Sequence, residues 1–433
     1  MIEIFALKKG EGLPEKLKRR SQLNQEEVRE RVREILFQVR TRGDEALFEY
    51  TRRFDGVELQ SLRVTQEEMG AALGEVPEEL LEVIRASKEN ILSFHEKQRE
   101  KSWIDFSEGR ALGQLLRPIE RVGVYVPGGS APLASSVLMN ALPARAAGVP
   151  RIAMATPPGR DGRVHPAILA AAAECGVSEI YKVGGAQAIA ALAYGTRSVP
   201  KVDKIVGPGN LYVASAKREV YGEVGIDMIA GPSEVLVIAD ETAKPRFVAA
   251  DLLSQAEHDA QAAAILVTTS PALASAVQEE LRLQLLALPR REIAQKSLED
   301  NGAILLAEDL EQAFDLANEI APEHLELCVE DAFAKLGLVK NAGACFLGNY
   351  SPEPLGDYFA GPNHVLPTSG TARFFSPLSV QDFYKKTSVI FYEKEAFLRA
   401  AGMIERFAYA EELDAHAGAA TRRKEEESPH AQG

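Results

Sequence analysis

The sequence is short of cysteine and histidine, with three cysteines and seven histidines among its 433 residues. Cys175, Cys328 and Cys345 are odd in number and far apart in the chain, so we expect reduced core thiols without a catalytic role. The lack of paired cysteines excludes a closed zinc site built from thiolates. Any bound metal would therefore need histidine nitrogens and oxygen donors.

Long apolar runs and an excess of basic residues are also missing. No run approaches the roughly 20 residues that cross a bilayer, and residues 1–10 lack the basic start and apolar core of a secretory signal. The formal net charge of -14 would repel phosphates, which disfavours nucleic acid and anionic membranes as partners. We expect a cytoplasmic protein that acts on a small-molecule substrate.

Length and periodicity predict the fold class. A chain of 433 residues, 46% of them hydrophobic, is too long for one core, so two packed lobes are expected. The first third is predicted to be helical, because a capping box of Asn24 and Glu27 precedes apolar residues at helical spacing. Residues 44–54 and 77–98 continue that pattern.

From Val122 onward, short β-rich runs alternate with alanine-rich helices, which is typical of parallel sheets covered on both faces. The expected strands form two series: 122–126, 151–155, 179–183, 203–206 and 234–239, then 264–268, 302–307, 325–329 and 343–347. The prediction is an α/β fold with two lobes. After them we expect a strand at 387–392, helices near 395–402 and 411–423, and a frayed tail from 424.

Residues 348–377 show no periodicity and are crowded with proline, glycine and aromatic residues. Long structureless loops in compact proteins are usually functional or disordered, and the aromatic residues argue against disorder. We therefore expect a functional loop, which contains Asp357 and His364.

Gln255 and His258 lie on the polar side of an amphipathic segment at 249–261. They are three residues apart, so on a helix their side chains project together, as two metal ligands must. A solvated polar face has the same spacing. The pattern alone leaves both interpretations open.

Glu323 and His324 stand where a helix meets a strand, and α/β proteins place reactive side chains at the carboxyl edge of the sheet or in the connecting turns. A histidine beside a carboxylate suits a general base. A pair that merely caps the helix fits equally well. Asp357, His364 and His416, each taken alone, fit the protein surface as well as a site.

The remaining histidines are expected to have no chemical role: His95 on a charged helix face, His165 before the proline of a helix start, and His430 in the tail. Three glycine-rich turns, at 126–130, 183–187 and 206–210, each follow an expected strand and open a helix. Backbone amides at such turns can hold phosphate. None is a complete Gly-x-Gly-x-x-Gly, so ordinary tight turns and an unusual nucleotide site both stay open.

Taken together, these segments resemble the histidinol dehydrogenase family over nearly the whole chain, from about Glu26 to His416. The most specific stretches are Arg-Val-Gly-Val-Tyr-Val-Pro-Gly-Gly at 121–129, Val-Gly-Pro-Gly-Asn at 206–210, Ala-Gly-Pro-Ser-Glu at 230–234, Asp-Leu-Leu-Ser-Gln-Ala-Glu-His at 251–258, Ala-Pro-Glu-His at 321–324, and the loop from Ser351 through Gly-Pro-Asn-His at 361–364 to Leu-Pro-Thr-Ser at 366–369.

The resemblance implies a set of site residues that come from separate segments of the chain. Zinc would be held by Gln255, His258, Asp357 and His416. The catalytic base would be His324, with Glu323 beside it. Substrate contacts would be Ser233, His364 and Glu411, together with His324 and the zinc ligands. NAD contacts would be Tyr125, Gln187 and Asn210, which lie in the glycine-rich segments.

The activity that the resemblance implies is the NAD-dependent four-electron oxidation of L-histidinol to L-histidine through bound L-histidinaldehyde, the last steps of histidine biosynthesis. His324 would take the hydroxyl proton and later act on the aldehyde hydrate, and Glu323 would activate water. Zinc would serve mainly as a template for the imidazole and amine nitrogens of the substrate. Glu411 would accept the remaining imidazole N–H.

The resemblance also implies incomplete Rossmann-like α/β/α lobes and a domain-exchanged homodimer. We expect an N-terminal extension (1–24), a discontinuous α/β domain (25–116 and 240–376), a second α/β domain with the nucleotide-binding turns (117–239), and a C-terminal segment (377–433) that crosses to the partner. Two alternatives have other chemistry. One is a related dehydrogenase for a different small alcohol, and the other is a zinc hydrolase or metal-dependent binding protein without redox chemistry.

Overall fold

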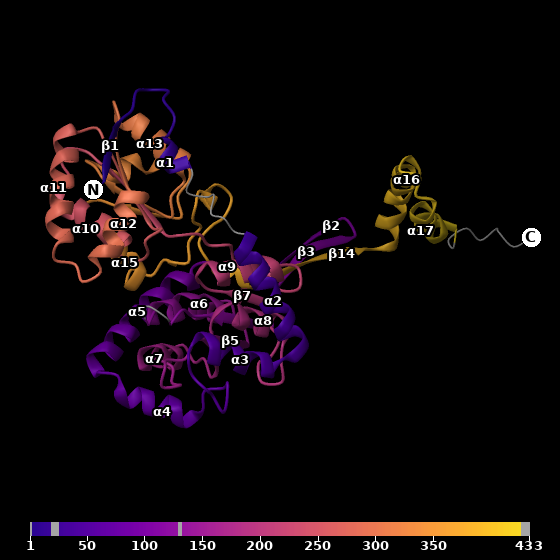
Figure 1. Cartoon of the computed structure of the whole chain (residues 1–433). Helices are drawn as coiled ribbons and strands as arrows, with labels where there is room; N and C mark the ends of the chain where they lie inside the picture. The colour runs from indigo at the N-terminus through magenta and orange to yellow at the C-terminus, as the bar shows by residue number, and fades with distance from the viewer. Residues whose placement is uncertain (1, 19–25, 129–131, 426–433) are drawn as a thin grey trace, which may run out of the picture. The chain divides into compact units, whose positions relative to one another are not determined.

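The computed structural model describes residues 2–18, 26–128 and 132–425, and the chain divides into two compact units (Figure 1). The larger unit comprises Met1–Arg99 and Ile119–Phe383, and the smaller unit comprises Glu100–Pro118 and Tyr384–Gly433. The expected capping residue Asn24 and the tail histidine His430 lie outside the described residues.

A five-stranded parallel sheet forms one part of the larger unit. Its strand order is β6 (Glu179–Lys182), β5 (Arg151–Thr156), β4 (Arg121–Tyr125), β7 (Lys204–Val206) and β8 (Gly225–Ile226). One core joins the strands to α2 (Glu26–Arg42), α3 (Asp44–Phe54), α8 (Gly185–Tyr194) and α9 (Leu211–Val220). A second group of helices consists of α4 (Gln66–Glu75), α5 (Glu78–Glu96), α6 (Ala134–Ala146) and α7 (Pro166–Glu174). Helix α6 contacts β4, and α4 packs against α7.

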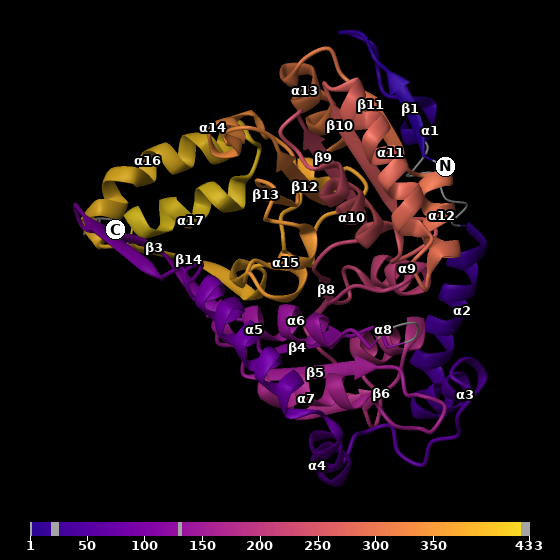
Figure 2. The same cartoon turned by 90° about the vertical axis from the view of Figure 1, so that its left-hand side faces the viewer.

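A six-stranded parallel sheet forms the other part of the larger unit. Its order is β1 (Glu3–Ala6), β11 (Ala303–Leu306), β10 (Ala263–Thr268), β9 (Glu234–Ala239), β12 (His324–Cys328) and β13 (Ala344–Leu347). Helices α10 (Pro245–Ala256), α11 (Pro271–Leu285) and α12 (Arg291–Asp300) lie together along it (Figure 2). The opposite core contains α1 (Glu15–Lys18), α13 (Leu310–Ile320) and α14 (Ala332–Lys335), which η2 (Leu336–Leu338) follows.

Successive side chains of β9 belong alternately to two different cores, which explains why helices cover both faces of this sheet. Val235 and Val237 belong to the core with α10, α11 and α12. Leu236 and Ile238 belong to the core with α13. Successive strand residues point to opposite faces, so a strand buried on both faces must be apolar throughout. The predicted α/β fold with parallel sheets is confirmed.

The structure departs from the expected domain boundaries at several places. β1 pairs with β11, so the expected N-terminal extension contributes a strand to the six-stranded sheet. β3 (Arg110–Pro118) pairs with β14 (Tyr384–Tyr392), which joins residues that were expected in different domains. β9 pairs with β10 and β12, so it belongs to the six-stranded sheet and not with the other strands of 117–239. α2 and α3 pack on the five-stranded sheet and not with 240–376. Periodicity reports how a strand or helix is buried, but it does not say which sheet receives it.

Two local expectations were also wrong. Residues 348–377 contain the short helix α15 (Glu353–Tyr358) and the 3-10 turn η3 (Thr371–Arg373), both too short to give a periodic pattern. His95 is completely buried and not on a charged face, with its Nδ1 2.8 Å from Gln98 Oε1 and its Nε2 3.3 Å from Asn363 Nδ2. Asn363 lies far along the chain, so local sequence could not reveal this partner.

The cysteines behave as expected. All three are free, Cys175 and Cys328 are buried, and Cys345 is half-buried. Burial raises the pKa of the Cys175 thiol to about 12 and that of the Cys345 thiol to about 11, so both are protonated at neutral pH.

The smaller unit is an antiparallel sheet followed by two helices. Its strand order is β14 (Tyr384–Tyr392), β3 (Arg110–Pro118) and β2 (Trp103–Ser107), and η4 (Val380–Phe383) precedes β14. Helices α16 (Lys394–Ala410) and α17 (Asp414–Glu425) pack against each other. The expected C-terminal strand and helices are confirmed, although β2 and β3 were not predicted. Among the described residues, no helix is both long and apolar enough to span a membrane.

Candidate metal centre and active site

Two of the expected catalytic and substrate-binding residues, Ser233 and His324, lie where strands of the six-stranded sheet begin. Ser233 directly precedes β9, and its carbonyl accepts a hydrogen bond from Ala263 N at the start of β10 (3.0 Å). His324 is the first residue of β12. Ser233 therefore lies in the connection that leads into β9, and His324 lies in its strand at the amino edge of the sheet and not at the carboxyl edge.

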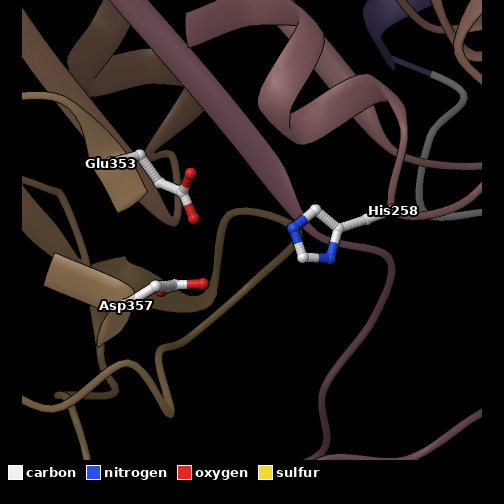
Figure 3. Close-up of side chains that lie close together, drawn as sticks. All are labelled: His258, Glu353 and Asp357. Atoms are coloured by element: carbon white, nitrogen blue, oxygen red, sulfur yellow. The ribbon is translucent and has the colours of Figure 1, made fainter. Parts of the chain in front are cut away.

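His258, Glu353 and Asp357 form a compact cluster in the larger unit (Figure 3). One ligand atom from each lies within 4.8 Å of the others. His258 follows the end of α10, with its backbone N–H donating to the carbonyl of Gln255 (3.2 Å), whereas Glu353 and Asp357 are both on α15. An imidazole nitrogen and carboxylate oxygens are donors that zinc accepts. This cluster is the candidate metal centre.

Gln255 is in the last turn of α10 and is only 1% exposed. Its side-chain oxygen has no hydrogen-bond partner among the described residues. A solvated polar face is therefore wrong for this residue. An unpartnered buried amide oxygen is costly unless something completes it, and a metal ion would do so.

His324 is buried between a carbonyl group and a carboxylate. Its Nδ1 lies 3.1 Å from the backbone oxygen of Glu234, and its Nε2 lies 4.0 Å from Asp357 Oδ1 without a hydrogen-bond partner. A carbonyl oxygen can only accept, so Nδ1 carries the proton and Nε2 presents its lone pair. Burial lowers the pKa of His324 to about 4, although the Asp357 charge opposes that shift. The imidazole is thus a neutral base.

Glu323 is fixed by the same backbone segment. Its Oε2 accepts a hydrogen bond from Glu234 N (2.9 Å) and lies 3.7 Å from His324 Nδ1. Burial raises the pKa of the Glu323 carboxyl well above its usual range, so the group binds a proton more strongly than a free glutamate. Ala321, two residues before Glu323, has a left-handed backbone (φ 50), which ends α13 sharply ahead of the Glu323–His324 pair.

Asp357 stands at the centre of these contacts. His364 Nδ1 lies 3.5 Å from Asp357 Oδ1, the same oxygen that His324 approaches. Despite its burial, the pKa of the Asp357 carboxyl is held well below its usual range, chiefly by the charge of His364. Asp357 is therefore a carboxylate at neutral pH, as a metal ligand must be.

More carboxyl groups lie behind Asp357. Glu326, in the middle of β12, accepts a hydrogen bond on Oε1 from Glu353 N (2.7 Å) and shares a side-chain hydrogen bond with Asp251 of α10. Burial raises the pKa of Glu353 to about 9, that of Asp251 to about 6, and that of Glu326 well above its usual range. Within the described residues, no lysine or arginine forms a salt bridge with any of the four carboxyl groups.

The expected nucleotide contacts lie in turns of the five-stranded sheet. The Tyr125 hydroxyl, at the end of β4, accepts a hydrogen bond from Gly185 N (3.0 Å), and Gln187 is buried in the first turn of α8. Asn210 caps α9, because its Oδ1 accepts from Tyr212 N (3.1 Å) and Val213 N (3.2 Å). These contacts account for the turns structurally and leave their nucleotide role untested.

The turn after β7 is held by a buried ion pair between Lys217 and Asp227. Lys217 Nζ donates to Gly207 O (2.8 Å), and Asp227 Oδ2 accepts from Gly207 N (2.8 Å). Gly207 has φ +120, and a Cβ there would collide with the Tyr125 carbonyl, so glycine is required. The turn is thus held at Gly207 by both members of the ion pair.

Glu411 and His416 belong to the smaller unit. Glu411 ends α16, and His416 lies in the first turn of α17; both are exposed.

Comparison with known proteins places the chain in a family. The family model described as histidinol dehydrogenase matches residues 18–424. The chain belongs to the histidinol dehydrogenase family. Histidinol dehydrogenase of Caldanaerobacter subterraneus subsp. tengcongensis is 57% identical over 421 residues, with 96% of this chain and 98% of that protein covered. Histidinol dehydrogenase of Bacillus cereus is 58% identical over 412 residues, with 95% and 96% covered.

A solved structure agrees with this assignment. The crystal structure of histidinol dehydrogenase from Elizabethkingia anophelis matches with a TM-score of 0.92 and 41% identity, covering 98% of each chain. The chain is therefore an oxidoreductase of the histidinol dehydrogenase family, as the sequence motifs indicated.

Glu353 is the residue near the metal cluster that sequence reasoning missed. The signal was its spacing: Glu353 and Asp357 are four residues apart in Ser-Pro-Glu-Pro-Leu-Gly-Asp, which puts both on one side of a helix. Because the segment was expected to be irregular, the four-residue spacing was not interpreted as two side chains on one side of a helix.

Proposed function

We propose that the chain is an L-histidinol dehydrogenase, which oxidises L-histidinol to L-histidine through bound L-histidinaldehyde with NAD as oxidant and zinc as metal ion. These are the last steps of histidine biosynthesis. Family membership supports the substrate. The observation that carries the chemistry is the neutral, buried His324, whose Nε2 has no hydrogen-bond partner and lies beside the candidate metal centre.

His324 is proposed as the base of both oxidation steps. With its Nδ1 proton held by the Glu234 carbonyl, its Nε2 can accept only at the open side of the ring. A base with this tautomer can take the hydroxyl proton of the alcohol and, after hydration of the aldehyde, the hydroxyl proton of the hydrate. The pKa of about 4 keeps it unprotonated at neutral pH.

Glu323 is proposed to take a proton from the water that adds to the aldehyde. Its carboxyl is positioned by Glu234 N, and its raised pKa suits a proton acceptor. The same glutamate anchors both partners, because Glu234 offers its N–H to Glu323 and its carbonyl to His324. The two groups are thereby held in fixed relative positions.

The residues present fit a zinc ion. Gln255 offers a buried amide oxygen without a partner, while His258 and Asp357 offer donors that already lie together. We propose that these three residues and His416 hold the ion. When bound, zinc supplies a positively charged template for the substrate's imidazole and amine nitrogens, and NAD supplies the hydride acceptor.

The remaining substrate and cofactor contacts follow the family pattern. Ser233 directly precedes β9, and His364 Nδ1 lies 3.5 Å from Asp357 Oδ1; both residues are proposed to bind substrate. Glu411 is proposed to accept the free imidazole N–H of the substrate. Tyr125, Gln187 and Asn210 are proposed to contact NAD. Support for the last assignment is topological, because β4 and β7 flank the point where the strand order reverses, and α/β sheets bind ligands at such points.

A homodimer with exchanged C-terminal segments is proposed as the active form. In the smaller unit, large apolar side chains are exposed, among them Trp103, Phe106, Ile390, Met403 and Phe407. Exposed apolar surface of this kind marks a protein interface. Exchange would let Glu411 and His416 complete the site of the partner subunit, so that each site uses two chains.

An absorbance assay tests this function. Zinc-loaded enzyme with L-histidinol and NAD should yield about two equivalents of NADH per L-histidinol, because two hydride transfers convert an alcohol to an acid. L-alaninol, which lacks the imidazole, is the matched control and should give little NADH. Equal rates with both alcohols would indicate a dehydrogenase for another substrate. No NADH with any alcohol would indicate a zinc hydrolase or binding protein.

A further inference from the structure

Glu234 is joined to both proposed catalytic residues through its backbone. It is the first residue of β9 and is 3% exposed. Its N–H donates to Glu323 Oε2 (2.9 Å), and its carbonyl accepts from His324 Nδ1 (3.1 Å). One short piece of backbone therefore sets where the carboxyl group and the imidazole stand relative to each other. A small shift of Glu234 would move both groups.

The side chain of Glu234 joins this backbone to a loop that is distant in sequence. Its Oε1 accepts a hydrogen bond from Ser369 N (2.6 Å). Ser369 has φ 54 and is followed by Gly370 with φ 78, so the loop turns through the left-handed region at the point of contact. A residue other than glycine in that conformation is strained and persists only where its surroundings hold it. The hydrogen bond from Ser369 N to Glu234 helps to hold this turn.

A second hydrogen bond joins the same two segments without ending on Glu234. Gly231 N donates to Thr368 Oγ1 (2.6 Å), and Thr368 is 2% exposed. A Cβ at Gly231 would collide with the hydroxyl of Ser369, so the two segments are in close contact. The Gly231–Thr368 hydrogen bond thus also anchors the loop. It ends on Gly231, however, and not on the residue whose backbone holds the catalytic pair.

We propose that Glu234 is a positioning residue for the Glu323–His324 pair, and that its side-chain oxygen acts by anchoring the Glu234 backbone to Ser369 N. This inference rests on the proposed function, because it takes Glu323 and His324 as the reacting groups. Hydration and oxidation of the bound aldehyde need both groups in register, whereas oxidation of the alcohol needs His324 alone. Loss of the anchor should therefore impair the second oxidation more than the first.

The charge of Glu234 gives it a second way to influence the pair. Burial raises the pKa of the Glu323 carboxyl, and the charge of Glu234 adds to that shift. A role through charge would depend on the ionised group and not on the length of the side chain. Two variants separate the roles: Glu234→Gln keeps the length and an oxygen acceptor but loses the charge, whereas Glu234→Asp keeps the charge and is one methylene shorter.

The test measures kcat, KM for L-histidinol and the NADH formed per L-histidinol with the zinc-loaded enzyme. Glu234→Asp should lower kcat by about 10-fold to 100-fold, because a misplacement on the order of 1 Å can cost that much. Its KM and zinc content should stay close to wild type. Because the aldehyde reacts more slowly, part of it should escape and be trapped by semicarbazide, so that less NADH forms per L-histidinol. Glu234→Gln should stay close to wild type in every quantity.

Thr368→Val is the matched control, because it removes the other hydrogen bond between the two segments. Its kcat and its yield of NADH should stay close to wild type, and urea unfolding reports how much each variant weakens the fold. A structural role for Glu234 predicts a different result. Thr368→Val and Glu234→Asp would then be equally slow, and both would keep the wild-type yield of NADH. That outcome would overturn the proposal.

The opposite order of the two Glu234 variants would also overturn it. A slow Glu234→Gln beside a normal Glu234→Asp would show a role through charge, and the acidic limb of the Glu234→Gln pH profile would move to lower pH as the pKa of Glu323 falls. If Glu234→Asp does not fold, Glu234→Gln decides: wild-type turnover supports the anchor, and a loss of more than about 10-fold overturns it. The proposed function is tested separately, by wild-type activity with L-histidinol.

Discussion

The Gly207 turn of the five-stranded sheet and the Asp357 cluster beside the six-stranded sheet treat buried polar side chains differently. At Gly207, Lys217 is paired to Asp227, and both side chains are bonded to the glycine backbone. In the candidate site, Gln255 Oε1 and His324 Nε2 have no hydrogen-bond partner among the described residues. The ionic side chains of the Gly207 turn are therefore paired within the protein, whereas the candidate site keeps unpartnered polar atoms.

The two regions should therefore differ in what a substitution affects: the stability of the fold at Gly207, and ligand binding and catalysis at the candidate site. Buried polar groups that are fully paired hold a backbone in place, and losing one partner destabilises the fold. Unpartnered buried polar groups that gather beside candidate ligands can be completed by a bound ligand, so substitution there should affect binding and catalysis more than folding. The predictions below test whether the two regions respond in these different ways.

The largest effect is expected for His324→Gln. Loss of a general base typically slows a reaction by about 10²-fold to 10⁴-fold, and the substitution removes no zinc ligand. Turnover measured from NADH formation should fall by that amount while zinc content, measured by elemental analysis, stays at the wild-type value. Turnover near wild type from pH 6 to pH 9 would show that His324 is not the base.

In the Gly207 turn, Lys217→Met is expected to lower the free energy of unfolding by about 3–5 kcal/mol, because Asp227 is left buried without its cation. Lys201→Met is the control: the Lys201–Glu223 pair is exposed, and its loss should change the free energy of unfolding far less than the loss of Lys217. Urea unfolding measures both, with metal-free protein. Equal costs for the two substitutions would contradict the structural role given to the Lys217–Asp227 pair.

In the candidate site, His258→Asn is expected to lower the affinity for zinc by at least about 10-fold to 100-fold. His258 is exposed and outside the core, so the free energy of unfolding of the metal-free protein should change by less than about 0.5 kcal/mol. Zinc titration and urea unfolding give the two values. A variant with normal zinc content and normal activity would remove His258 from the ligand set.

The smallest expected change is a partial recovery of activity from two inactive variants. If Glu411 and His416 act in the site of the partner subunit, mixing His258→Asn and His416→Asn chains gives mixed dimers in which one site holds both substitutions and the other holds none. Random pairing makes about half of the dimers mixed, so about a quarter of wild-type activity should return. Subunit exchange is checked with differently tagged chains. Complete inactivity after proven exchange would refute the exchanged segment.

Much of the fold could be predicted because the residues of a strand themselves indicate whether it is buried on one face or on both. The apolar run of β9, for instance, predicts a strand covered on both faces. The sheet that β9 joins could not be predicted, since its pairing with β10 and β12 depends on crossovers between distant segments. His95 was misplaced for the same reason, because its partner Asn363 is remote in sequence.

The candidate site was predicted to a similar degree. Gln255, His258 and Asp357 were identified through the family motifs, and polarity alone could not separate ligands from a solvated face. Glu353 was missed because α15 is too short to produce a periodic pattern. The sequence therefore did not indicate that Glu353 and Asp357 lie on the same side of a helix. The tautomer of His324 also depends on a backbone carbonyl ninety residues away, which no local pattern encodes.

The most direct measurement is a zinc titration of the metal-stripped wild-type dimer that follows bound zinc and NADH formation from L-histidinol together. We predict that about one zinc per chain binds tightly, since the unpartnered donors gather at a single cluster, and that activity rises in proportion to its occupancy. Full activity in the stripped enzyme, or tight zinc binding that leaves activity unchanged, would contradict the conclusion that a metal ion completes this site.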